Sequence, residues 1–384
     1  MFKYLLVFAV VFLFCVVLRA QDVEASKAKS WSLDGRIQLQ HLYDNSIKAD
    51  DMENNNGFRM RRTRLEVKAK LTDWVSGKIQ FEVRDNAPRL KDAEAKMKIF
   101  ERYNVRLGQF KVPVWREELR SSGSLFLVER SETAAFLEEN LLSSRHIGLE
   151  VGGSYKNGIS FAVNYSNGAG EGVREDAGIS KYHTLTSLIS DTLINVPVTS
   201  PNNGKLFTGR INYAIKKIAE IGISVALNQL GNKISDLNLD NKGNVYVIAP
   251  DFGLYLPFGL EIEGGLAVGE ISGDLTSGSS SGNIIINSKD KNFNLADVTA
   301  LWKKSLDKPM EKFAGFDGYG FAAGISYIEP DTHTDDNELL SFRFGPVIFF
   351  GKQFRIQVNG EIEHLSAPDT DDVFKIRSQA TLNL

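Results

Sequence analysis

The sequence predicts an all-β fold: a transmembrane antiparallel β-barrel of 16 strands, with short periplasmic turns and long extracellular loops. Three observations predict it. Apolar and polar residues alternate in 16 segments, the connections between these segments are mostly short at one end and long at the other, and the chain opens with a segment typical of exported proteins.

The composition excludes several other classes of protein. The 384 residues are 42% hydrophobic and 24% charged, which is typical of a folded chain. The 24 Phe, 11 Tyr and 4 Trp residues, with 33 Gly against 10 Pro, favour strands and turns over helices. The net charge of −3 gives no reason to expect nucleic acid as a partner. Cys15 is the only cysteine, so the exported chain should have no disulfide framework.

Residues 1–20 are expected to be a signal peptide. Lys3 precedes an unbroken apolar run from Tyr4 to Leu18, and Ala20 is a small residue at the exit. A membrane anchor is the alternative, but the run is short for a transmembrane helix of roughly 20 residues. Residues 21–384 are then expected to form a single outer-membrane β-barrel domain, and the protein is predicted to reside in the bacterial outer membrane.

The alternation is clearest in Arg62–Leu71, whose sequence is RTRLEVKAKL. From Leu65 onward the odd positions are apolar, and the even positions are charged throughout, so one face of the strand is apolar and the other is polar. The same pattern recurs along the chain. The predicted strands are Ser32–His41, Arg62–Leu71, Trp74–Arg84, Ala93–Ile99, Tyr103–Leu107, Arg145–Tyr155, Ile159–Tyr165, Phe207–Tyr213, Ala219–Leu227, Asn244–Leu256, Leu260–Val268, Phe293–Trp302, Tyr319–Tyr327, Leu340–Phe350, Phe354–His364 and Phe374–Leu384.

A barrel explains this pattern better than a soluble β-sandwich. Lipid offers no partner to backbone groups, so a spanning sheet must close on itself, with its apolar face outside and a polar interior. A sandwich of this size would need many large residues in its core. The apolar faces here are instead rich in Ala, Gly and medium-sized aliphatic residues, with aromatic residues such as Trp74 and Tyr165 near segment ends.

The connections between the predicted strands are short at one end of the barrel and mostly long at the other. The long connections include 85–92, 112–144 and 166–205, and the exception is 303–318, a long connection at the short end. The tract 112–144 contains WREELR and ETAAFLEEN, which favour helix, and it is expected to fold into the lumen as a constriction loop. An external loop with a short helix is the alternative.

Positive charge is concentrated on the polar faces of the second to fifth predicted strands. Nine cations lie there against three anions, Glu66, Glu82 and Glu94, whereas the charges on the other strands balance. Guanidinium and ammonium groups along a pore wall concentrate anions, which favours an anion pathway over a catalytic site. Including Lys111 at the entry to the long loop, the candidate residues are Arg62, Arg64, Lys68, Lys70, Lys78, Arg84, Lys96, Lys98, Arg106 and Lys111.

Three stretches resemble the phosphate-selective porin O and P family: RRTRLEVKAKL, LKDAEAKMKI, and the tract from Arg106 to Glu132. The clearest match is GQFKVP at Gly108–Pro113, followed by EEL at 117–119 and ERS at 129–131. The resemblance covers about residues 56–170 and implies an outer-membrane barrel of 16 strands, usually trimeric, with a constriction loop after the fifth strand.

The resemblance also implies an arginine ladder that includes Arg61, Arg62 and Arg64. The alternation places Arg62 and Arg64 inside, whereas Arg61 faces inward only if a bulge shifts the register. Because Arg210 is the only candidate on the middle strands, a general preference for anions is better supported than strict phosphate selectivity.

The function expected from these features is a porin through which small anions such as phosphate or polyphosphate diffuse passively. Its expected partners are those anions, outer-membrane lipid and lipopolysaccharide, and two further copies in a homotrimer. The protein is not expected to be an enzyme or to hold a cofactor or metal, since the five histidines show no ligand spacing and no nucleophile motif occurs. The alternatives are a barrel with a blocked lumen that binds ligands or catalyses a reaction at its loops, and a secreted soluble β-protein.

Overall fold

The computed structural model describes residues 28–47, 55–85, 87–172, 204–230, 242–272 and 290–384, and the backbone of three short hairpins, β8–β9 (Thr186–Ile189, Thr192–Asn195), β12–β13 (Lys233–Ile234, Leu239–Asp240) and β16–β17 (Ser279–Ser280, Asn283–Ile284). The predicted signal peptide lies outside the described residues. The described residues include no helix that is both long enough and apolar enough to span a membrane.

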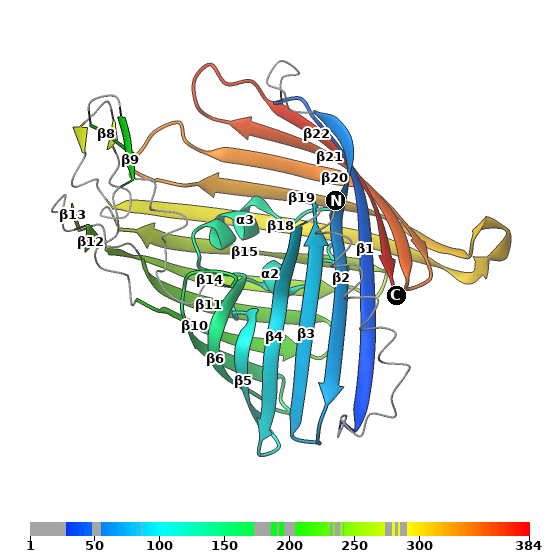
Figure 1. The fold of residues 1–384 in the computed structure, drawn as a ribbon. Helices are drawn as coiled ribbons and strands as arrows, with labels where there is room; N and C mark the ends of the chain where they lie inside the picture. The colour runs from blue at the N-terminus through cyan, green and yellow to red at the C-terminus, as the bar shows by residue number, and fades with distance from the viewer. Residues whose placement is uncertain are drawn as a thin grey trace, which may run out of the picture.

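Sixteen antiparallel strands form one closed barrel, which confirms the predicted fold class and strand number (Figure 1). In barrel order the strands are β1 (Ser30–Asp44), β2 (Asn56–Lys70), β3 (Val75–Arg84), β4 (Ala87–Ile99), β5 (Tyr103–Lys111), β6 (Arg145–Ser154), β7 (Ile159–Ser166), β10 (Leu206–Ile215), β11 (Ala219–Leu230), β14 (Gly243–Tyr255), β15 (Leu260–Ile271), β18 (Lys291–Met310), β19 (Phe316–Glu329), β20 (Leu339–Phe350), β21 (Phe354–Leu365) and β22 (Val373–Asn383).

The first and last strands close the sheet. Arg36 of β1 lies opposite Asn383 of β22, and the backbone groups of Gly35 and Leu384 bond to each other at 2.9 and 3.1 Å. Closure leaves no unpaired edge along the barrel wall, which is the condition for placing a sheet in lipid.

The apolar face of each strand lies on the outer surface, as the alternation predicts. Phe81 is 51% exposed and Ile99 is 42% exposed, whereas their polar neighbours Gln80 and Glu82 are buried inside. These large apolar residues form the convex perimeter of the barrel, where neighbouring strands place them side by side, as with Leu65 and Phe81.

Two β-bulges change which residues face inward. The register of β1 and β2 shifts between Gln38 and Leu39, so Arg61 is an extra residue in β2. The register of β3 and β4 shifts between Gln80 and Phe81, so Lys91 is an extra residue in β4. Each bulge places two consecutive residues on the inner side, because the extra residue interrupts the strict alternation of side chains.

Two predicted connections differ from the structure. The tract 85–92 is mostly strand, because β3 and β4 pair up to Arg84 and Ala87. The tract 303–318 is a hairpin in which β18 and β19 continue past the other turns at that end, and a short 3-10 helix, η3 (Glu311–Phe313), forms its tip. Figure 1 shows this hairpin projecting from the barrel. The connection 303–318 is therefore long because β18 and β19 extend further than the other strands at this end.

The tract after β5 lies inside the barrel. It contains α2 (Arg116–Leu119) and α3 (Glu132–Glu139), both seen within the barrel in Figure 1. Ser131 caps α3 by accepting a hydrogen bond from the Ala134 amide at 3.2 Å. Residues 112–144 are hereafter called the inner loop.

Lumen-facing side chains hold the middle of the inner loop against the wall. Gln38 of β1 donates to the Ser122 carbonyl at 3.1 Å, and Gln357 of β21 donates to the Phe126 carbonyl at 2.9 Å. The Val128 amide donates to the Asn359 side chain at 2.6 Å. These bonds satisfy loop backbone groups that are buried away from water.

The interior is not polar throughout, and that expectation is wrong for one half of the lumen. An apolar cluster joins the inner loop to inward-facing positions of β10 to β19. Its loop members include Val114, Trp115 and Leu137, and its wall members include Val247 and Leu295, all at most 2% exposed. The inner loop therefore packs on this half of the wall like part of a soluble protein core.

Candidate functional site

A cavity of about 790 Å³ separates the basic wall from the inner loop. Arg64, Lys68, Lys78 and Arg106 line it from β2, β3 and β5, and Lys111 lies where β5 enters the loop. Ser121 and Ser124 line it from the loop side. The cavity is therefore open to water along the wall that the sequence marks as basic.

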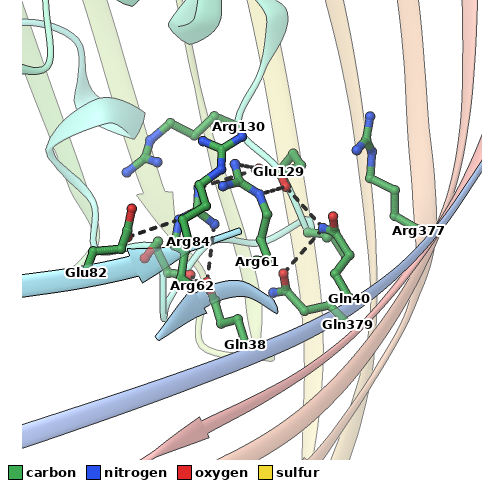
Figure 2. Close-up of polar contacts among 12 residues, drawn as sticks. Gln38, Gln40, Arg61, Arg62, Glu82, Arg84, Glu129, Arg130, Arg377 and Gln379 are labelled. Carbon is green, nitrogen blue, oxygen red and sulfur yellow. Dashed lines mark hydrogen bonds and ion pairs between the residues drawn. The ribbon is translucent and has the colours of Figure 1, made fainter. Parts of the chain in front are cut away.

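Four arginines of β2 project inward where the inner loop lies against the wall, at Glu129 and Ser122: Arg59, Arg61, Arg62 and Arg64. This place is hereafter called the narrow section. Arg61 and Arg62 are 8% and 6% exposed, and both point to the interior because the bulge places them there. Arg59 lies on the same side and donates through Nε to Gln40 at 2.7 Å. Figure 2 shows Arg61 and Arg62 converging with Arg84 and Arg130 around Glu129.

The inner loop supplies the central carboxylate of this group. Glu129 accepts hydrogen bonds from Arg61 Nε at 2.5 Å and Nη2 at 2.8 Å, and from Gln40 at 3.1 Å. Burial alone would raise the pKa of Glu129, but the hydrogen bonds and charge of Arg61, followed by the charge of Arg62, hold that pKa well below its usual range. Glu129 thus stays ionised and ties the loop to β2.

The ion pairs of the described residues divide the basic wall into separate groups. The first, which we call the upper group, joins five cations to three carboxylates: Arg59, Arg61, Arg62, Arg64 and Lys91 with Glu82, Glu129 and Glu171. Its formal charge is +2. Arg62 makes no close ion pair, since its nitrogens lie 3.6 Å from Glu129 and 3.9 Å from Glu82, but its Nη1 atom donates to Gln38 at 3.2 Å.

Two further groups lie beside the upper group. The first contains Lys111 and Arg130 with Glu118, a formal charge of +1. The second is neutral, because three cations match three carboxylates: Lys78, Arg106 and Arg145 with Asp92, Glu94 and Glu150. Excess positive charge is thus concentrated at the narrow section and is not spread evenly along the wall.

The candidate residues nearest the short turns surround a second cavity of about 660 Å³. Lys70, Lys96 and Lys98 line it, and all three are exposed. Lys70 lies 2.9 Å from Asp73, and Lys98 lies over the Trp74 ring. These lysines are solvated and are not part of the narrow section.

The structure brings the sequence-predicted candidates together only in part. Arg64, Lys68, Lys78, Arg106 and Lys111 line the cavity of about 790 Å³. Arg62 belongs to the upper group with Arg64, and Arg84 lies at the end of β3, 3.3 Å from Asp85. The charge count changes as well, because the bulge at Lys91 makes Asp92 an inward carboxylate that contacts Lys78 and Arg145. The sequence had placed Asp92 in a loop.

Sequence reasoning missed Arg59, Lys91, Arg130 and Arg145. The amino-acid sequence does contain a signal for Arg59 and Lys91. In FRMRRTRL, Phe58 and Met60 alternate with arginines until Arg61 and Arg62 stand side by side, and in LKDA two polar residues separate Leu90 from Ala93. Adjacent polar residues inside an otherwise strict alternation mark a bulge. Arg130 has no such signal, because its place depends on the path of the inner loop.

This arrangement of charges can concentrate anions. The cations lie along a water-filled wall, opposite serine hydroxyls, and the described residues include no cluster of His, Cys, Asp and Glu suited to a metal ion. Fixed positive charge beside low-dielectric walls attracts anions and repels cations.

The comparisons with known proteins agree with this geometry. Residues 32–183 match the family model of phosphate-selective porins O and P. The chain is a porin-type outer-membrane barrel. The match includes β1 to β7 and the inner loop, and it confirms the resemblance seen in the sequence. Together, the family match and the fold support an outer-membrane channel.

Solved structures share the porin fold over almost the whole chain. The outer-membrane protein OmpT of Vibrio cholerae, with its loop L8 deleted, is 11% identical, with a TM-score of 0.60 over 92% of this chain and 99% of that one. The outer-membrane channel DcaP of Acinetobacter baumannii is also 11% identical, with a TM-score of 0.58 over 92% of this chain and 97% of that one. OprB of Pseudomonas putida is 9% identical, with a TM-score of 0.54 over 93% and 94% of the two chains.

At this level of identity these likenesses concern the fold alone. No curated protein sequence matches the chain. The chemistry of this barrel therefore depends on the residues of its own lumen.

Proposed function

We propose that this porin admits small anions, such as phosphate or polyphosphate, by passive diffusion past the inward cations of β2 to β5 and the inner loop. One observation carries the proposal: Arg59, Arg61, Arg62 and Arg64 face the same lumen, in a group that retains a formal charge of +2 after its ion pairs are counted. Guanidinium groups suit phosphate and carboxylate oxygens because they donate two parallel hydrogen bonds.

The candidate residues have different roles in this proposal. The upper group and the Lys111–Arg130 pair set the preference for anions, because these two groups hold the excess of positive over negative charge among the ion-paired residues of the basic wall. Lys68, Lys78 and Arg106 line the adjoining cavity, and Lys70, Lys96 and Lys98 line the periplasmic exit. The inner loop acts as the constriction, since Glu129 and Lys111 hold it beside the basic wall.

The test is the reversal potential of the purified porin in a planar bilayer under a potassium chloride gradient. We expect the sign that corresponds to chloride permeating faster than potassium. A cation-selective current would contradict the proposal, and an absence of current would favour a barrel with a blocked lumen. Replacing chloride by phosphate in the same bilayer then tests whether oxyanions permeate.

We also propose, from the family resemblance, that the barrel assembles as a homotrimer in contact with outer-membrane lipid and lipopolysaccharide. The mass of the detergent-solubilised assembly under native conditions tests the number of copies. A monomeric mass in every mild detergent would contradict it.

A further inference from the structure

The half of the lumen opposite the basic wall is filled by apolar side chains. Ala249 and Ala267 point inward from β14 and β15, and Phe293 and Leu295 point inward from β18; all four are at most 2% exposed. The inner loop completes the cluster with Trp115, Leu137 and their neighbours. We call this set of residues the apolar block.

The loop and wall parts of the apolar block are fitted closely. The Phe136 and Phe293 rings lie 5.0 Å apart. A Cβ atom added at Gly265 would lie 2.9 Å from the Trp115 ring, so the wall at this point has no room for a side chain. Such packing excludes water and therefore ions.

Buried carboxylates lie on the periplasmic side of the apolar block. Glu117, Asp251, Glu263 and Asp297 are each at most 7% exposed and share with Trp115 a void too small for a water molecule. Arg210 pairs with Asp251, and Arg120 pairs with Glu263. The Asp297 Oδ1 atom is buried without a hydrogen-bond partner, and the carboxylates of Glu117 and Glu263 are among the charges that act on it.

A cavity of about 520 Å³ lies on the periplasmic side of these carboxylates and shares Arg106 and Leu119 with the lining of the cavity beside the basic wall. Asn212, Glu220 and Tyr255 line it, each near the periplasmic end of its strand. In the part of the chain that the structure describes, the apolar block lies between this cavity and the extracellular ends of β11 to β18. The cavity therefore has polar walls but no path to the extracellular side through the apolar block.

We infer that the apolar block is a seal that confines ions to the basic wall by closing a second route through the lumen. That route would pass Asp251, Glu263 and Asp297 and would carry no excess of positive charge. Trp115 and Leu137 are therefore positioning residues for selectivity, although they touch no ion. The inference rests on the proposed function only for which ion is favoured. The existence of the seal does not depend on the proposed function.

Thiol labelling tests the seal without any measurement of selectivity. The exported chain is expected to have no cysteine, so Ala267→Cys introduces a single thiol into the apolar block. We expect a charged methanethiosulfonate reagent to leave this thiol unmodified and to modify it fully once Trp115→Ala is added. Equal labelling in both backgrounds would overturn the seal. Ser121→Cys, in the cavity beside the basic wall, is the control that should react in both.

Selectivity gives the second readout. Trp115→Ala should raise single-channel conductance and shift the reversal potential in a potassium chloride gradient towards zero, because a route without excess positive charge opens in parallel. The double variant Leu137→Ser/Leu295→Ser should do the same with the Trp115 contact intact, so the test survives if one variant fails to fold. Unchanged conductance and reversal potential in both variants would overturn the inference.

Asp297→Asn distinguishes an opened route from a distorted loop. In the native background the substitution should leave the reversal potential unchanged, because Asp297 lies behind the seal. In the Trp115→Ala background it should move the reversal potential back towards anion selectivity. Equal effects in the two backgrounds would contradict the inference. If the native porin proves unselective, the proposed function fails, whereas the labelling result still decides whether the seal exists.

Discussion

Arg61 of β2 and Glu129 of the inner loop form a two-point ion pair across the lumen, with Nε–Oε1 and Nη2–Oε2 distances of 2.5 and 2.8 Å. The pair exists because a β-bulge turns Arg61 inward, and because the loop folds back into the barrel far enough to bring Glu129 to β2. The pair links the β2 wall to the inner loop, which are the two sides of the proposed anion path.

Reversing the charge of Arg62 and Arg64 together, as Arg62→Glu/Arg64→Glu, should reduce the preference for anions steeply at low salt and much less at high salt. Mobile ions screen fixed charges over about 30 Å at 0.01 M but only about 3 Å at 1 M. Reversal potentials at the two salt concentrations measure this. Equal losses at both would indicate a steric role instead. Lys304→Glu/Lys308→Glu, on the projecting hairpin, makes the same change of charge outside the lumen and should have little effect.

Deleting Arg61 should lower the stability of the barrel about as much as Arg61→Gln does, by about 1–3 kcal/mol. The deletion removes the bulge but leaves Arg59 and Arg62 facing the lumen and Met60 facing lipid, because Met60 then directly precedes Arg62 in strict alternation and keeps its partner Leu39. Both variants lose the ion pair with Glu129. Denaturant unfolding in lipid vesicles measures the two stabilities. A much larger loss on deletion would show that the bulge does more than place Arg61 inside the lumen.

Glu129→Gln should lower stability by about 1–3 kcal/mol, because Arg61 loses a charged, hydrogen-bonded partner. It should also raise the preference for anions at low salt, since one negative charge leaves the narrow section. A double-mutant cycle with Arg61→Gln isolates the pair: the two substitutions together should cost less than the sum of the single losses. Strict additivity would mean that the two side chains do not act on each other.

The pair should survive mild acid. The pKa of Glu129 is depressed in the folded protein, so the stability it contributes is fully present above the unfolded carboxyl pKa of about 4.3 and is lost only as pH falls towards the lower folded value. Between pH 7 and pH 5, the stability difference between the native chain and Glu129→Gln should therefore stay constant. A difference that shrinks across this interval would contradict the depressed pKa.

Gly108→Ala should prevent normal barrel assembly. Gly108 has φ +117°, and an added Cβ atom would lie 2.0 Å from the Ala93 carbonyl oxygen in the neighbouring strand. An alanine is strained in that backbone conformation even without the clash. Gly77→Ala is the matched control, since its Cβ atom would be 3.6 Å from the nearest backbone atom. The yield of folded barrel after refolding compares the two, and equal yields would disprove the constraint.

The sequence by itself determines the barrel, its strands and which face of each strand meets lipid. Leu65, Ile79 and Phe81 lie outside as their alternation predicts, because a period of two is a property of the strand and is readable without any partner. The GQFKVP and ERS motifs also indicate the resemblance to phosphate-selective porins O and P before any coordinates are known, and the family model matches residues 32–183.

The charge of the lumen follows the alternation only until a bulge interrupts it. Arg59, Lys91 and Asp92 were missed because one extra residue changes the facing of its neighbours along the strand. Adjacent polar residues in the sequence mark both bulges, so the inward facing of these side chains can be predicted from the sequence.

The tertiary structure alone decides what faces the cations. Glu129 and Arg130 reach β2 through a loop whose path depends on contacts with distant strands, such as the bond from the Val128 amide to Asn359. Inward-facing Val247 and Leu295 are covered by Trp115 and Leu137 for the same reason. A two-residue period reports the faces of a strand, whereas the pairing of charges and the filling of a lumen depend on residues that only the closed barrel brings together.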